Sequence, residues 1–123
     1  MSQLVRDVMT TGVTAVRPNA SLVEAAQLMR AQDIGDVFVA QDGHLLGVLT
    51  DRDITVRAVA DGADPLTVNA QSVCTPWPVC VGPDESVAAA LSLMRRHEVR
   101  RLPVVENGRT LGVVSLGDLP HEA

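Results

Sequence analysis

The sequence predicts an α/β (α+β) protein built from two β-α-β-β-α repeats. The phrase GVLTDRDI begins at Gly47 and returns as GVVSLGDL at Gly112, 65 positions later. With the same offset, residues 8–54 align with residues 73–119 without a gap. Within each copy the apolar residues change between the two-residue period of a strand and the 3.6-residue period of a helix. An Asp-Gly or Asn-Gly pair also separates two apolar runs in each copy, which is typical of a β-hairpin.

The first two elements of each repeat are a short strand and an amphipathic helix. In the first repeat the strand covers residues 13–16 and ends before Pro18. Ser21 and Glu24 then have the spacing of a capping box at a helix start. Apolar residues follow at helical spacing in both copies: Leu22, Ala25, Ala26 and Met29 in the first, and Val87, Ala90, Leu91 and Met94 in the second.

The hairpin and a closing helix complete each repeat. The first hairpin joins residues 37–40 to 45–49 through Asp42-Gly43. The second joins residues 102–105 to 111–114 through Asn107-Gly108. A helix is expected from Asp51 to about residue 60, with Gly62 as its stop.

The chain divides into repeat 1 at residues 1–60, a linker at 61–69 and repeat 2 at 70–123. From this division we expect no separate catalytic or DNA-binding domain. The net charge of −5 and the absence of lysine argue against binding to nucleic acid. No apolar run approaches the roughly 20 residues that span a membrane.

The sequence has only two cysteines, no dense disulfide framework and no signal-peptide pattern at its start. We therefore expect the protein in the cytoplasm. Cys74 and Cys80 have a C-x5-C spacing that matches no common zinc site, and we expect two small buried side chains. Trp77, between two prolines, is expected to anchor a loop.

Thr50 and Ser115 each end a predicted strand and open a helix, and Asp53 and Asp118 follow three residues later. Two interpretations are open. A capping box accounts for these residues without any ligand, although Glu or Gln reaches back to the N-cap better than Asp does. Alternatively, the unpaired N–H groups of a helix start favour a phosphate, and the carboxylate accepts hydrogen bonds from the diol of a ribose.

The motif G-h-h-[ST]-x-x-D-h, in which h is apolar, occurs in both repeats after a glycine-bearing hairpin, and the second hairpin begins with Arg-Leu-Pro-Val-Val. Over about residues 4–119 the duplicated unit resembles the cystathionine-β-synthase (CBS) domain, and the tandem pair resembles a stand-alone Bateman module. The resemblance implies two units packed through their sheets about a pseudo-twofold axis, with adenine nucleotides such as AMP, ADP or ATP in the clefts between them. It also implies a homodimeric disc. Phe38 departs from the family pattern, which has the proline seen at Pro103.

By the same resemblance, the segment before the hairpin of one repeat approaches the sugar-binding aspartate of the other. One cleft would combine Thr50 and Asp53 with Arg100 and Arg101. Arginines form charge-assisted, forked hydrogen bonds with phosphate, so this cleft is expected to hold the phosphorylated ligand.

The opposite cleft would combine Ser115 and Asp118 with Asp36 and Thr14. An aspartate repels phosphate, by about 4 kcal/mol for two unit charges at 4 Å and an effective dielectric of 20. This cleft is therefore expected to stay empty or to prefer a less charged ligand.

No catalytic motif is present, so we expect a regulatory module that is not an enzyme. It would require no cofactor, bind an adenine nucleotide as a regulatory ligand and signal to an unknown protein effector in trans. The alternative is a dimeric interaction or stress-related scaffold that binds no nucleotide. A switch that responds to thiols or metals through Cys74 and Cys80 is a third hypothesis.

Overall fold

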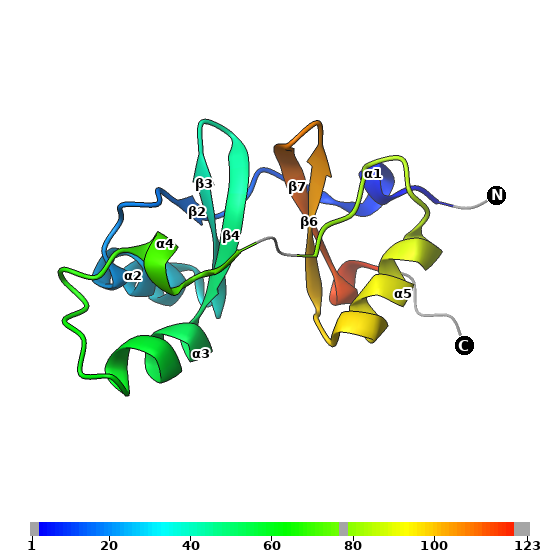
Figure 1. Cartoon of the computed structure of the whole chain (residues 1–123). Helices are drawn as coiled ribbons and strands as arrows, with labels where there is room; N and C mark the ends of the chain where they lie inside the picture. The colour runs from blue at the N-terminus through cyan, green and yellow to red at the C-terminus, as the bar shows by residue number, and fades with distance from the viewer. Residues whose placement is uncertain (1–2, 77–78, 120–123) are drawn as a thin grey trace. The chain divides into compact units, whose positions relative to one another are not determined.

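The computed structural model describes residues 3–76 and 79–119 of the chain (Figure 1). The chain forms two compact units. Unit 1 contains residues 1–13 and 79–123, and unit 2 contains residues 14–78. The prediction for Trp77 lies outside the described residues.

Unit 2 contains most of the first sequence repeat. Its elements are β2 (Ala15–Val16), α2 (Leu22–Gln32), β3 (Asp36–Gln41), β4 (His44–Thr50), α3 (Asp51–Asp53), the π-helix η1 (Ile54–Val59), α4 (Ala70–Val73) and β5 (Thr75–Pro76). Strand β2 pairs parallel with β3, β3 pairs antiparallel with β4, and β4 pairs antiparallel with β5. Helices α2, α3 and α4 lie on one side of the β3–β4 hairpin (Figure 1).

Unit 1 repeats this arrangement with most of the second repeat. Its elements are α1 (Val5–Val8), β1 (Thr10–Thr11), α5 (Val87–His97), β6 (Arg101–Glu106), β7 (Arg109–Ser115) and the 3-10 helix η2 (Leu116–Asp118). Strand β7 pairs antiparallel with both β1 and β6, and Val81 forms a parallel bridge to Val104. The predicted order β-α-β-β-α and the α+β class are confirmed, although within the described residues the closing helix of the second repeat is only the short η2.

Both hairpins turn where the sequence predicts. Asp42 and Gly43 have φ values of 53° and 82°, and Asn107 and Gly108 have φ values of 54° and 79°. Two consecutive residues with positive φ form the tight turn whose twist matches that of the flanking strands, and Asn, Asp and Gly tolerate this conformation best.

The two long helices also begin after the expected serine N-caps. The hydroxyl of Ser21 accepts a hydrogen bond from the backbone N–H of Glu24 at 3.0 Å, and Ser86 accepts one from Ala89 at 3.1 Å. The buried face of α2 consists of Leu22, Ala25 and Met29. Ala26 was predicted to share this face, and this is wrong, because its side chain is exposed.

Each unit has its own apolar core. The main buried side chains of unit 2 are Val16, Leu22, Ala25, Met29, Val37, Val39, Leu49 and Val73. Those of unit 1 are Val5, Val81, Val87, Ala90, Met94, Leu102, Val104, Val114 and Leu119. With so few aromatic residues in the chain, aliphatic side chains supply nearly all of the hydrophobic stabilisation.

The first segment of each sequence repeat packs in the unit that contains the rest of the other repeat. In unit 1, Val5 donates its N–H to the carbonyl of Glu85 at 2.8 Å, just before α5. In unit 2, Ala70 donates to the carbonyl of Ala20 at 2.8 Å, just before α2. Helices α1 and α4 are thus equivalent elements that have changed places between the repeats.

Candidate functional site

The Thr50 side chain lies where β4 ends and α3 begins. Its hydroxyl accepts a hydrogen bond from the N–H of Asp53 at 3.0 Å, and the Asp53 carboxylate accepts one from the N–H of Thr50 at 3.0 Å. This reciprocal capping box is the first of the two interpretations open from the sequence, and it is fully formed. The Asp53 side chain is only 13% exposed, so its carboxylate is held in one orientation.

Arg57 extends this cluster by one helical turn. Its Nε lies 3.8 Å from Asp53 Oδ1, and its Nη1 donates to the carbonyl of Val73 at 3.3 Å. Sequence reasoning missed Arg57, although its position four residues after Asp53 is the spacing of neighbours on a helix surface.

Cys74 lies beside the same carboxylate. Burial raises the pKa of its thiol, and the negative charge of Asp53 raises that pKa further, against smaller lowering effects of a backbone hydrogen bond and of Arg57. The thiol donates to the carbonyl of Gln71 at 3.3 Å. Cys80 was expected to be buried, and this is wrong, because it is exposed.

The glycine of the repeated motif permits a close approach between strands. A Cβ atom at Gly47 would lie 2.6 Å from the carbonyl oxygen of Thr75 and 2.8 Å from the sulfur of Cys74. At Gly112 a Cβ atom would collide with the carbonyl oxygen of Thr10. The glycines therefore let β5 and β1 lie against the hairpins of units 2 and 1.

Further acidic groups surround Thr50 in unit 2. Asp36 is directly opposite Thr50 in the β3–β4 register. Asp51 donates its N–H to the carbonyl of Gly35 at 2.9 Å, and its carboxylate would lie 3.2 Å from a Cβ atom at Gly35. We call Asp36, Thr50, Asp51, Asp53 and Arg57 the Thr50 edge.

The equivalent position in unit 1 has different chemistry. Arg101 is directly opposite Ser115 in the β6–β7 register, and the carbonyl of Arg100 accepts a hydrogen bond from Leu116 at 2.8 Å. Ser115 makes no side-chain capping bond to η2, and Asp118 is exposed. We call Arg100, Arg101, Ser115 and Asp118 the Ser115 edge.

Thr14 is placed beside Phe38. Its carbonyl accepts a hydrogen bond from the N–H of Phe38 at 3.0 Å, and its hydroxyl donates to Gln32 Oε1 at 2.6 Å. Pro103, at the equivalent position of the second repeat, has no N–H to donate. Phe38, which stands where the family pattern has proline, therefore makes a backbone hydrogen bond that Pro103 cannot make. Phe38 itself is buried.

The structure thus brings the predicted residues together in two groups, one in each unit. Thr50 and Asp53 form a pair in unit 2, and Arg100, Arg101 and Ser115 lie together in unit 1. Two expected combinations stay predictions: Thr50 and Asp53 with Arg100 and Arg101, and Ser115 and Asp118 with Asp36 and Thr14.

Within residues 3–76 and 79–119, no three His, Cys, Asp or Glu side chains are grouped so that they could hold a metal ion. The helices in the same ranges are too short or too polar to cross a bilayer.

Comparison with known proteins places the chain in a family. The family model described as CBS domain matches residues 5–59 and again residues 70–121. The chain is 43% identical to the CBS domain-containing protein YhcV of Bacillus subtilis, over 94% of this chain and 81% of that protein. It is 39% identical to Hypoxic response protein 1 of Mycobacterium tuberculosis, over 93% of this chain and 80% of that protein.

Solved structures agree with these matches. The crystal structure of Hypoxic Response Protein I with two coordinated zinc ions has a TM-score of 0.86 and 38% identity, and covers 94% of this chain and 95% of that one. A CBS domain pair in complex with 5′-methylthioadenosine and S-adenosyl-L-methionine shares the fold at a TM-score of 0.82 and 24% identity, over 96% of this chain and 93% of that one. CBS domain pairs are generally regulatory modules that bind ligands. The chain belongs to the CBS domain family and contains two CBS repeats in tandem.

Proposed function

We propose that the protein is a cytoplasmic regulatory module that binds an adenine nucleotide and signals to a protein partner in trans, without catalytic activity of its own. Its membership of the CBS family supports a sensing role. A CBS domain pair with a similar fold has been solved in complex with 5′-methylthioadenosine and S-adenosyl-L-methionine, which supports an adenosine-containing ligand.

The Asp53 carboxylate is the observation that carries the proposal. One oxygen accepts the Thr50 N–H, whereas the other lies 3.8 Å from Arg57 Nε, which is longer than a hydrogen bond. An ionised carboxylate has about four acceptor positions, so the cap leaves capacity for the two hydroxyls of a ribose. Because the side chain is mostly buried and held by the cap, it loses little conformational entropy when a ligand binds.

The charges of the two edges suggest a division of roles. Three carboxylates make the Thr50 edge suited to hydroxyl donors and unfavourable for phosphate. The arginine pair of the Ser115 edge is suited to phosphate. In the proposal Asp53 and Thr50 bind the sugar, Arg100 and Arg101 serve the phosphate of the same ligand, and Ser115, Asp118 and Thr14 serve at most a less charged one.

Titration calorimetry with AMP, ADP, ATP and S-adenosylmethionine tests this proposal. We expect one tight site per chain. Asp53→Asn keeps an oxygen that can accept the Thr50 N–H but removes the charge, so it should weaken binding by at least about tenfold while stability changes little. Arg101→Glu should abolish binding, and Asp118→Ala should leave it unchanged.

The control is Arg109→Glu, which changes the net charge as Arg101→Glu does but at the far end of β7, where the side chain is exposed. It should bind like the parent protein. The milder Arg101→Gln leaves binding measurable, and if its effect and that of Asp53→Asn are not additive, the two residues act on one ligand molecule. Two equal sites, or a site that is lost with Asp118→Ala and kept with Arg101→Glu, would contradict the assignment.

One observation favours a second candidate function. The alternative function is a dimeric interaction scaffold that binds no nucleotide. The capping box is consistent with it, because it accounts for Thr50 and Asp53 without any ligand. In that case no nucleotide changes the melting temperature, and Asp53→Ala costs about 1 kcal/mol of stability with no other consequence.

A further inference from the structure

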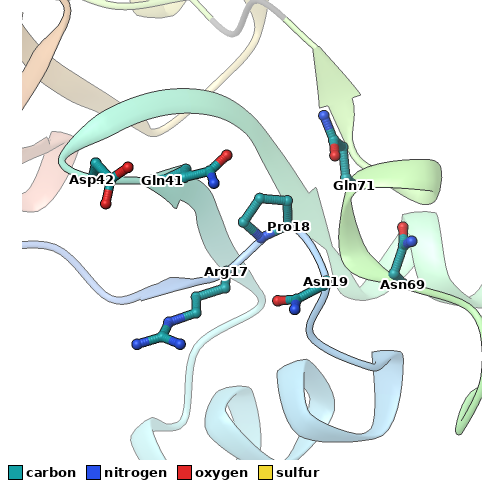
Figure 2. Close-up of a pocket in the computed structure, with 7 residues that line it drawn as sticks. All are labelled: Arg17, Pro18, Asn19, Gln41, Asp42, Asn69 and Gln71. Atoms are coloured by element: carbon teal, nitrogen blue, oxygen red, sulfur yellow. The ribbon is translucent and has the colours of Figure 1, made fainter.

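Unit 2 has a concavity that contains none of the residues of the Thr50 edge. It has a volume of about 500 Å³, and three segments line it: the turn between β2 and α2, the end of β3 with its hairpin turn, and the start of α4. The lining residues are Arg17, Pro18, Asn19, Gln41, Asp42, Asn69 and Gln71 (Figure 2).

The lining is polar and carries both signs of charge. Four of the seven residues are carboxamides, which both donate and accept hydrogen bonds. In Figure 2, Arg17 and Asp42 lie on one side of Pro18, and Asn69 and Gln71 lie on the other. Among the described residues, no side chain forms an ion pair with Arg17 or Asp42. A small ligand with paired opposite charges at one end and a polar group at the other would match this distribution.

The equivalent surface of unit 1 is occupied by an ion pair. Arg6 and Asp84 stand where unit 2 has Gln71 and Asn19, and Arg6 Nε and Nη2 lie 2.8 Å and 2.6 Å from Asp84 Oδ1. The backbone frame is the same in both units: Gln71 donates its N–H to the carbonyl of Pro18 at 3.1 Å, and Arg6 donates to that of Pro83 at 2.9 Å. Unit 2 therefore has the same backbone hydrogen bond as unit 1. In place of the two charged side chains that pair in unit 1, however, it has two carboxamide side chains.

We propose that this pocket binds a free α-amino acid with a polar side chain, independently of the nucleotide. An α-amino acid carries its carboxylate and its ammonium group on the same carbon, and Arg17 and Asp42, which lie on the same side of Pro18 in Figure 2, offer one partner for each. The carboxylate receives charge-assisted hydrogen bonds from Arg17, and the ammonium group donates to Asp42. Asn69 and Gln71 bind the polar side chain of the ligand, and the Asn69 amide nitrogen is available because only its Oδ1 caps α4, by accepting the Ser72 N–H at 2.9 Å.

The test measures the melting temperature of the full chain with each of the twenty common amino acids, followed by calorimetry with those that raise it. We expect one or more polar amino acids to stabilise the protein. Arg17→Gln and Asp42→Asn should each weaken their binding by roughly tenfold or more. Arg30→Gln is the matched control, since Arg30 is an exposed arginine in the last turn of α2, and it should bind like the parent.

A second variant follows from the comparison of the units. Asn19→Asp with Gln71→Arg installs the ion pair of unit 1, so it should fill the pocket, abolish amino-acid binding and leave nucleotide binding unchanged. If this double variant does not fold by circular dichroism, Arg17→Gln still decides the question. The proposal is overturned if no amino acid stabilises the protein, if the double variant folds and binds like the parent, or if carboxylic acids without an ammonium group bind as tightly as amino acids.

Discussion

Replacing Gly47 with alanine tests whether the motif glycine is required by the approach of β5. The new Cβ would lie 2.6 Å from the Thr75 carbonyl oxygen, whereas real Cβ contacts essentially never fall below 3.0 Å. One of the two strands must therefore move by roughly 0.4 Å. The colliding atom belongs to the backbone of a strand that is paired with β4 through Gly47↔Pro76 and Val48↔Thr75, so it cannot rotate away as a side chain would.

The expected cost combines two opposing terms. Overpacking of this kind costs about 1–3 kcal/mol, and a backbone collision belongs in the upper part of that range. Alanine in place of glycine in a strand recovers about 0.5–1 kcal/mol of conformational entropy. The net loss should be about 2 kcal/mol, which lowers the melting temperature by roughly 6–10 °C in a chain of this size.

Urea unfolding of Gly47→Ala checks this value, because the midpoint should fall while the slope stays constant. Gly112→Ala should lose at least as much. Gly117→Ala is the control: a Cβ atom there meets nothing within 4 Å, so this variant should lose no stability and should gain at most about 1 kcal/mol. If Gly47→Ala were as stable as this control, the steric reasoning would be refuted.

Three further predictions follow from the structure. Ser86→Ala should cost about 1 kcal/mol in urea unfolding, whereas Ser115→Ala should cost less than half of that, because only Ser86 caps its helix; equal losses would contradict this. Desolvation and a nearby carboxylate, Asp53 for Cys74 and Glu85 for Cys80, raise the pKa of both thiols, so alkylation should need a pH above that of an ordinary cysteine; Cys80, the more exposed residue, should react before buried Cys74, and a common rate for both would be the contrary result. Sedimentation should give the homodimer that the family resemblance implies, and Val59→Asp should weaken it if η1 lies at the interface, because Val56 and Val59 on η1 are 50% and 61% exposed; a monomeric parent would contradict this.

Features with local causes could be predicted from the sequence. The hairpins follow from Asp-Gly and Asn-Gly because few other pairs tolerate two positive φ values. The helix starts follow from Ser21 and Ser86, whose hydroxyls reach backbone groups only three residues away. The pairing of Asp36 with Thr50 was also accessible, since the position of a tight turn sets the register of its strands.

Features that depend on burial or on distant segments could not be predicted in this way. Helical spacing predicts a stripe but not its width, so Ala26 was included although it is exposed. The cluster of Arg57 with Val73 and Cys74 forms because α4 packs beside η1, a contact between segments about 16 residues apart. The amino-acid pocket likewise assembles from three segments, none of which has a motif of its own.

The exchange of α1 and α4 between the repeats has a consequence for how such a chain could arise. A polypeptide with a single repeat could not complete its own core with its first segment, because that segment packs against the other copy's helix. Two identical short chains would meet this need by trading their amino-terminal segments, which is a domain-swapped homodimer. Gene duplication and fusion would then make the exchange of segments intramolecular. The two halves could afterwards diverge, so that one has the Arg6–Asp84 ion pair and the other has an open pocket.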